Sequence, residues 1–344
     1  MSLRRMGVPV LTAALLAAAI PFASPAQSSP ASPAQTLTLA SAALQSGEAD
    51  KALELLKSAP ASGPGSAQAH NLICRVRINL EQWDAAANEC EQAVRLDGSN
   101  SGYHLWLGRA LGEKADRASF LSAYSLAKRT RAEFEAAVRL DPRNGEALVS
   151  LGEFDRQAPG VVGGGMDKAQ QIAVQLDKVD PERAHEFRGR LAEQKKDYAA
   201  AEGEFKRAIA AGPHPAFGWT ALAGFYLRRQ RFAEMESAFH SALTAAQRDR
   251  QSGVALYDGA GLLLESNRNP ALAAAMLDEY LTNAAKTEEA PAFVAHLRLA
   301  RLKQQLGDAA AAGRECSAAL ALASQYKPAQ DFRPPNAGPQ QARF

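Results

Sequence analysis

Aromatic residues, cysteines and long apolar runs are all scarce in this sequence. Phe, Trp and Tyr make up 7% of its 344 residues, too few to suggest a compact β domain. The three cysteines form no CxxC motif, and neither a P-loop nor a GxSxG motif is present. After the N-terminal region no segment stays apolar for about 18 residues, so we predict no further membrane-spanning helix. The hydrophobic content of 47% is nevertheless sufficient for a buried core.

An excess of charge is also lacking. The formal net charge of +2 comes from Arg4 and Arg5, because residues 1–26 contain no acidic side chain. The remainder of the chain is close to neutral. Tight nucleic-acid binding depends on a basic surface that neutralises phosphates, so we predict no nucleic-acid partner.

The N-terminal region has the layout of a signal peptide. Arg4 and Arg5 precede an apolar stretch over residues 8–20, which ends at Pro21 and is followed by small residues up to Ala26. We expect cleavage after Ala26, with residues 1–26 as the signal peptide and no transmembrane segment in the mature protein. No cysteine follows the apolar stretch where a bacterial lipid would attach. The predicted location is therefore periplasmic or secreted, and a retained signal anchor is the alternative.

A pattern of small and aromatic residues returns along the chain about every 34 residues. The first half of the pattern occurs as Trp219, Leu222, Ala223 and Tyr226, and again as His104, Leu107, Gly108 and Leu111. The second half occurs as Ala201, Phe205, Ala208 and Pro213, and again as Thr130, Phe134, Ala137 and Pro142. This spacing resembles the tetratricopeptide repeat, with W-x2-L-G-x2-Y, then A-x3-F, then P. The resemblance implies an all-α, right-handed superhelical solenoid of antiparallel helix pairs.

The repeat can be followed through about eight helix pairs. The slot that the family fills with tryptophan holds His70, His104, Leu148, His185, Trp219, Tyr257 and His296, and an earlier unit is marked by Ala52, which lies 34 residues before Ala86. We predict units starting near residues 33, 67, 101, 145, 182, 216, 254 and 293. Residues 33–326 then form the solenoid. The flanking segments are rich in Pro, Gly, Gln and Ser, so we predict a linker over 27–32 and a disordered tail over 327–344.

The histidines and cysteines have interpretations within this repeat. Four histidines share one slot, and equivalent slots in neighbouring repeats lie roughly 10 Å or more apart, too far to share a metal ion. We therefore predict packing roles, with no metal and no cofactor. Cys74 and Cys90 lie on the first and second helix of one pair, at the same level, so they either form a disulfide or are two small core residues. Cys316 faces Ala300 and is expected to be a buried free thiol.

An arginine row is predicted on the concave face that such solenoids use for binding. The residue after the glycine slot is arginine in four units, namely Arg75, Arg109, Arg190 and Arg301. Guanidinium groups bind carboxylates in a bidentate manner, so this row is a candidate receptor for an acidic peptide. The alternative is an ordinary solvated helix face.

Two adjacent units are longer than the rest, and their extra residues fall near 112–126 and 157–165. Both insertions are expected between the first and second helix of a pair, on one edge of the solenoid, where they would touch. The second contains Gly163, Gly164 and Gly165, followed by Lys168. A structured packing loop and a phosphate cradle are both conceivable there, although the GK-[ST] sequence of a P-loop is missing.

The stretches GRALGEKADRASF, AEFEAAVRLDP and APGVVGGGMDKA resemble exported bacterial tetratricopeptide proteins of undefined function, which share a PGxxGGGxxKA loop. The resemblance implies fold and location, and brings no catalytic residue. We therefore predict a non-enzymatic scaffold in the bacterial cell envelope that binds a protein or peptide through its concave groove and its loop edge.

Two alternatives remain. One is a small-molecule sensor or enzyme with a pocket at the glycine-rich loop; its candidate residues are Arg109, Glu113, Lys114, Asp155 and Lys168. The other is an envelope assembly component that self-associates through exposed apolar positions.

Overall fold

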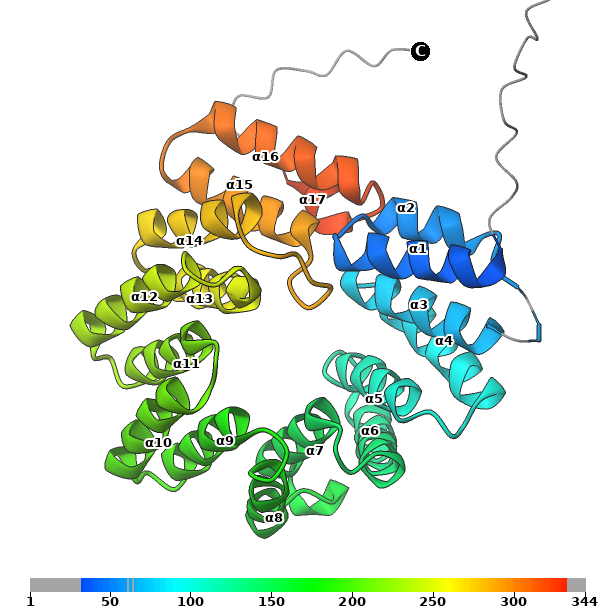
Figure 1. Cartoon of the computed structure of the whole chain (residues 1–344), viewed down its shortest axis with the longest axis horizontal. Helices are drawn as coiled ribbons and strands as arrows, with labels where there is room; N and C mark the ends of the chain where they lie inside the picture. Colours follow the sequence, from blue (N-terminus) through cyan, green and yellow to red (C-terminus); the bar gives the residue numbers. More distant parts are fainter. Residues whose placement is uncertain (1–31, 61, 64, 333–344) are drawn as a thin grey trace, which may run out of the picture. The chain divides into compact units, whose positions relative to one another are not determined.

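The computed structural model describes residues 32–60, 62–63 and 65–332. The predicted signal peptide and most of the linker lie outside these residues, and the compact helical unit begins at Pro33. Within the described residues the unit is all-helical, with no β-strand (Figure 1).

Successive helices pair in antiparallel fashion, as the repeat pattern predicts for a tetratricopeptide-like solenoid. The eight pairs are α1 (Pro33–Gln45) with α2 (Ala49–Leu56), α3 (Ser66–Asn79) with α4 (Trp83–Leu96), α5 (Ser101–Ala115) with α6 (Phe120–Leu140), α7 (Gly145–Gln157) with α8 (Met166–Leu176), α9 (Pro181–Gln194) with α10 (Tyr198–Ala211), α11 (Pro215–Arg228) with α12 (Phe232–Ala246), α13 (Gly253–Glu265) with α14 (Pro270–Thr282), and α15 (Ala292–Gln305) with α16 (Ala309–Leu322). Two single 3₁₀ turns (Gly160–Val162 and Arg250–Ser252) and a short last helix, α17 (Lys327–Asp331), complete the unit.

Short turns join the two helices of most pairs. In four of these turns a residue with positive φ lies two positions after the last residue of the first helix, namely Glu81 (59°), Lys196 (63°), Gln230 (58°) and Gly307 (86°). That left-handed residue closes the helix and reverses the chain. An acidic cap then begins the second helix in two pairs: Asp197 accepts from the Ala200 N–H, and Asp308 from the Ala311 N–H.

Glycine and small side chains let the two helices of a pair approach closely. A Cβ on Gly108 would lie 2.5 Å from the Phe134 ring, and a Cβ on Gly189 would lie 2.9 Å from the Phe205 ring. Cys74 and Cys90 occupy the corresponding two positions in the second pair, where they form a disulfide with a Cα–Cα distance of 5.3 Å. The bridge thus replaces the glycine–phenylalanine contact of other repeats.

The four histidines of the shared slot each bond a glutamate on the second helix of their own pair. The Nδ1 atoms lie 2.6–2.7 Å from a carboxylate oxygen in the pairs His70–Glu89, His104–Glu133, His185–Glu204 and His296–Glu315. Each pair links the first and second helix of one repeat. The glutamate partner is a feature that our sequence analysis missed.

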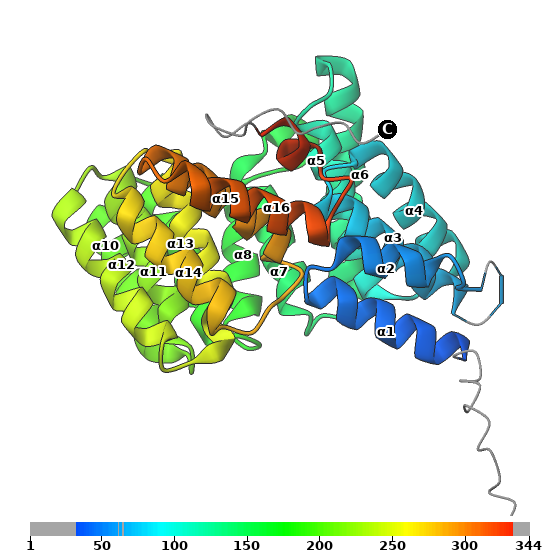
Figure 2. The same ribbon diagram turned by 90° about the horizontal axis from the view of Figure 1, so that it is seen from above.

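The last helices pack against the first ones, so the row of pairs closes on itself (Figures 1 and 2). One apolar cluster contains Leu37 and Leu44 of α1 together with Phe293 of α15 and Tyr326, whose ring lies 4.9 Å from that of Phe293. The Ser324 N–H also donates to Asp50 of α2 (2.8 Å). The repeat pattern predicts a solenoid with a concave groove and gives no indication of this closure.

Two boundaries differ from the sequence prediction. The tail predicted from residue 327 is wrong at its start, because Lys327–Asp331 form α17 and bury Ala329 in the closure cluster. The loop predicted over 112–126 is also wrong, because α5 continues to Ala115 and α6 begins at Phe120. Only residues 116–119 connect the two helices, since the extra residues contain no helix-breaking Gly or Pro after Gly112 and lengthen α6.

Candidate functional site

The first helices of the pairs line the concave side, and a pocket of about 340 Å³ opens there between α9, α11, α13 and α15. Gly224 of α11 lies at its wall, in the slot where four other repeats carry arginine. The absence of a side chain at this slot leaves space. The charged lining residues are Glu186, Arg190, Arg228, Asp258, Glu265 and Arg298.

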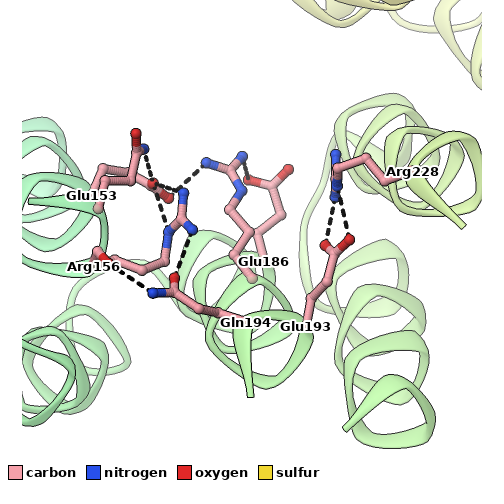
Figure 3. A network of polar contacts seen from close by, with 8 residues as sticks. Glu153, Arg156, Glu186, Glu193, Gln194 and Arg228 are labelled. Carbon is pink, nitrogen blue, oxygen red and sulfur yellow. Dashed lines mark hydrogen bonds and ion pairs between the residues drawn. The ribbon is translucent and has the colours of Figure 1, made fainter. Parts of the chain in front are cut away.

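All three arginines of this pocket are already bonded within the chain. Arg228 forms two hydrogen bonds with Glu193 (2.9 and 2.7 Å), as Figure 3 shows. Arg190 donates to Glu153 (2.9 Å). Arg298 donates to the Tyr257 carbonyl (3.1 Å) and stacks 3.9 Å from that ring centre. An incoming anion would have to compete with these contacts.

Glu153 joins neighbouring repeats through the network of Figure 3. It accepts from Arg190 of α9, and from Arg156 on its own helix (2.9 and 2.7 Å). Burial acts to raise the pKa of Glu153, but Arg190 and Arg156 outweigh it and hold that pKa below its usual value. Glu153 is therefore a structural anion that neutralises both guanidinium groups.

The carboxylates of the pocket are less well satisfied than the arginines. Asp258 is accessible from the groove and makes no hydrogen bond or ion pair within the described part of the chain. Surrounding protein nevertheless removes much of its hydration, which raises the pKa of Asp258 to about 6 against the opposing effect of Arg298. Burial likewise raises the pKa of Glu186, whose nearest cation, Arg190, is 3.7 Å away.

Two further acids beside this pocket share the same property. Burial, together with Asp180 and Glu186, raises the pKa of Glu182 to about 7. Burial also raises the pKa of Glu289, in the segment before α15. On this side of the groove, nearby cations do not offset the effect of burial on these carboxylates, and the site is suited to a further cationic group.

Most arginines of the predicted row form ion pairs with glutamates of the same chain. Arg75 forms a bidentate pair with Glu288, and Arg109 donates to Glu146 (3.0 Å). Arg190 pairs with acids as described above. Arg301 is exposed and makes no ion pair among the described residues. Three of the four arginines are thus not free to receive an external carboxylate.

The glycine-rich segment is a packed turn. Gly163 adopts a φ of 100°, and its carbonyl accepts from Lys168 Nζ (2.6 Å). A Cβ on Gly164 would lie 2.0 Å from the Ala158 carbonyl oxygen, and the Gly165 N–H donates to the Asp155 carbonyl (2.7 Å). The backbone groups face the protein itself, which matches the packing-loop alternative more closely than a phosphate cradle.

The residues of the predicted loop-edge pocket do not converge. Glu113 pairs with Arg117 (2.8 Å) and Lys114 with Asp84 (2.8 Å), both beside the α5–α6 turn. Asp155 is 2% exposed and bonds Arg131 of α6 (2.8 Å). The glycine-rich segment does contact α6, where Gly163 lies against Arg131.

Comparisons with known families agree with the paired helices. Two family models described as tetratricopeptide repeat match residues 12–75 and 164–216. The chain is a tetratricopeptide repeat protein. The first match begins within the predicted signal peptide, outside the described residues.

Solved structures similar to this tetratricopeptide repeat protein include a thermophilic repeat protein from Thermus thermophilus, at 17% identity over 57% of this chain and 100% of that chain, with a TM-score of 0.48. A tetratricopeptide repeat protein from Parabacteroides merdae is 12% identical over 87% of this chain and 99% of that chain, with a TM-score of 0.44. No curated protein matches the sequence.

Tetratricopeptide repeats generally mediate protein–protein interaction, and proteins built from them are generally scaffolds without catalytic activity. Among the described residues, none of the helices has the length and apolar character needed to cross a membrane. The residues that sequence analysis missed are the acids of the concave pocket. The sequence indicated the place of this pocket only through Gly224, which stands where other repeats carry arginine and which lines the pocket on the concave face.

Proposed function

We propose that this tetratricopeptide repeat protein is a non-catalytic scaffold that binds a segment of another protein in the pocket between α9, α11, α13 and α15, and that the segment presents a lysine or arginine side chain to Asp258. The observation that carries this proposal is the difference in bonding between the arginines of the pocket and Asp258. The three arginines are bonded to the protein, whereas Asp258 is accessible and has no partner among the described residues.

A cation at Asp258 would relieve an existing cost. The carboxylate is ionised at neutral pH, although its surroundings favour the neutral form. A hydrogen bond to a charged partner contributes about 1.5–3 kcal/mol, which corresponds to about 10- to 150-fold in affinity. Glu186 lines the same pocket and its pKa is also raised by burial, so it too favours a positively charged ligand.

We also propose that the protein acts in the cell envelope, either in the periplasm or after secretion. The proposal is supported by the basic and apolar N-terminal sequence and by the Cys74–Cys90 disulfide, since disulfides persist in oxidising compartments. Expression with the native N-terminus, followed by fractionation and N-terminal sequencing, tests both location and cleavage after Ala26. An intact N-terminus in the cytoplasmic fraction would contradict the proposal.

Binding can be tested with short peptides of equal length that carry lysine, arginine, glutamate or no charge. Wild type and Asp116→Asn are expected to bind the lysine and arginine peptides, and Asp258→Asn to lose at least about tenfold in affinity. Asp116 is the matched control, because it is exposed in the α5–α6 turn and away from the pocket. Equal binding by all three proteins, or a preference for glutamate peptides in this pocket, would overturn the proposal.

Self-association is a second candidate function with its own observation. Phe120 and Leu121 begin α6 and are 85% and 81% exposed, next to the half-exposed Tyr124 (39%). Exposed apolar groups of this kind favour contact with another apolar surface. Sedimentation of the full chain should show an oligomer that Phe120→Ser with Leu121→Ser weakens, whereas a wild-type monomer at all concentrations would remove this candidate.

A further inference from the structure

The segment between α14 and α15, residues 283–291, crosses the concave side toward α3 (Figure 1). Its first part is anchored to its own repeats, because the Ala285 N–H donates to the Arg250 carbonyl (2.8 Å). Lys286 Nζ donates to the Tyr280 carbonyl (2.6 Å). The next residues leave these anchors and reach helices that are more than 200 positions away in the sequence.

Glu288 is the point of contact, and it is only 9% exposed. Its carboxylate forms a bidentate pair with Arg75 of α3 and also accepts from Gln45 Nε2 (3.0 Å). Its main chain is bound as well. The Glu288 N–H donates to Gln45 Oε1 (3.3 Å), and its carbonyl accepts from Asn79 Nδ2 (3.0 Å).

These contacts are the kind that bind a peptide segment. Side chains of two helices satisfy both main-chain groups of Glu288, and a bidentate arginine selects its carboxylate. None of them depends on Glu288 being part of the same chain as α1 and α3. Gln45, Arg75 and Asn79 therefore form a complete recognition site for one glutamate in a peptide segment.

We propose that Gln45, Arg75 and Asn79 are a binding site for a glutamate-bearing segment of a partner protein, and that Thr287–Glu289 of this chain occupies the site as an intramolecular competitor. The tether keeps the competing segment at a high effective concentration. A partner binds when its segment displaces Glu288, and its apparent affinity falls by the fraction of time for which the site is filled. The site is separate from the Asp258 pocket and recognises the opposite charge, so the two proposals succeed or fail independently.

Release of Glu288 does not require the whole unit to open. The apolar closure cluster joins Leu37 and Leu44 of α1 to Phe293 of α15 and Tyr326, and it contains no residue of the segment itself. Gly47 also meets α15 closely, because a Cβ there would lie 2.6 Å from the Ala292 nitrogen. The segment can therefore leave the site while the first and last repeats stay in contact.

The experiment uses the full chain and a labelled synthetic peptide with the sequence of residues 285–291, AKTEEAP. Wild type has its site filled, whereas Glu288→Ala empties it. Fluorescence anisotropy is expected to show binding to Glu288→Ala that is at least about tenfold tighter than to wild type. The same peptide with alanine in place of its first glutamate, the counterpart of Glu288, is expected not to bind.

Arg75→Ala added to Glu288→Ala is expected to abolish binding of the AKTEEAP peptide. Circular dichroism of each variant establishes that it is folded, and Glu288→Gln, which keeps the hydrogen-bonding shape without the charge, serves as a milder way to weaken the internal contact. Absence of binding to both folded Glu288 variants would overturn the proposal. So would equal binding to wild type and Glu288→Ala, or binding that survives Arg75→Ala.

Discussion

The Cys74–Cys90 disulfide should contribute strongly to the stability of the second helix pair. The two residues are 16 positions apart, and both are fully buried. For a closed loop of that length, the loss of chain entropy in the unfolded state corresponds to about 3 kcal/mol at 25 °C. Reduction leaves the packing atoms in place, so it isolates this contribution better than substitution does.

Urea unfolding of wild type with and without a thiol reductant measures the effect. Trp83 begins α4 and Trp106 packs on the cluster around the bridge, so tryptophan fluorescence reports on this region when the third tryptophan, Trp219 of α11, is replaced by phenylalanine. A local probe is needed because an array of repeats need not unfold in a single step. The free energy of unfolding seen by this probe is expected to fall by about 3 kcal/mol on reduction.

Two controls separate the bridge from other thiol effects. Cys316→Ala removes the cysteine outside the bridge and should keep the full response to reductant. The double variant Cys74→Ala with Cys90→Ala should not respond at all. Identical unfolding of oxidised and reduced wild type would refute the entropy argument, and an intact mass with three alkylated thiols would refute the bridge itself.

Three further outcomes follow from the packing and the titrating groups. Gly108→Ala should destabilise the protein by about 1–3 kcal/mol, because the new methyl group overlaps the Phe134 ring. Gly112→Ala on the same helix should be neutral or stabilising, because its methyl group meets only an ordinary contact. Thermal unfolding of the two variants compares these effects. Glu182→Gln should raise the free energy of unfolding by about 1 kcal/mol at pH 8 and should change it little near pH 4. The reason is that the folded-state pKa of Glu182, about 7, exceeds the unfolded value, so ionisation of Glu182 costs stability as the pH rises between the two values. The expected magnitude is kept low because Glu182 is half-exposed. Peptides bearing lysine should bind less tightly below pH 6, as protonation removes the charge of Asp258.

Each of these predictions has a contradicting result. Equal melting temperatures for Gly108→Ala and Gly112→Ala would show that the Phe134 ring moves without cost. A stability difference between Glu182→Gln and wild type that does not vary with pH would show that the Glu182 carboxyl titrates normally. Lysine-peptide affinity that stays constant from pH 8 to pH 5, while Asp258→Asn still weakens it, would show that Asp258 acts without its charge.

Much of the helical framework was readable from local sequence. The small residues and the glycine–aromatic spacing predicted the pairs, because a residue such as Gly108 and its partner Phe134 lie within one repeat. The same reasoning placed Cys74 beside Cys90. It was less successful between residues 112 and 126, where extra residues were assigned to a loop although they extend helices. Inserted residues keep no repeat pattern, so their structure depends on helix propensity alone.

The candidate site was only partly predictable. The arginine row was located on the concave face, but the partners that neutralise Arg109 and Arg190 sit on neighbouring repeats and cannot be paired from spacing alone. Asp258 carries no motif. Its significance arises from lying opposite α9 and α15, where surrounding protein raises its pKa.

The sequence by itself determined that this protein is a row of about eight antiparallel helix pairs, because each pair is held by contacts between residues a few tens of positions apart. Only the tertiary structure decided that the row closes and that Arg75 meets Glu288 across 213 positions. That contact depends on the small rotation from each repeat to the next, which side-chain packing sets and which accumulates over the whole row. The repeat pattern determines which residues contact the adjacent helices, whereas the curvature summed over all repeats determines whether the first and last repeats meet.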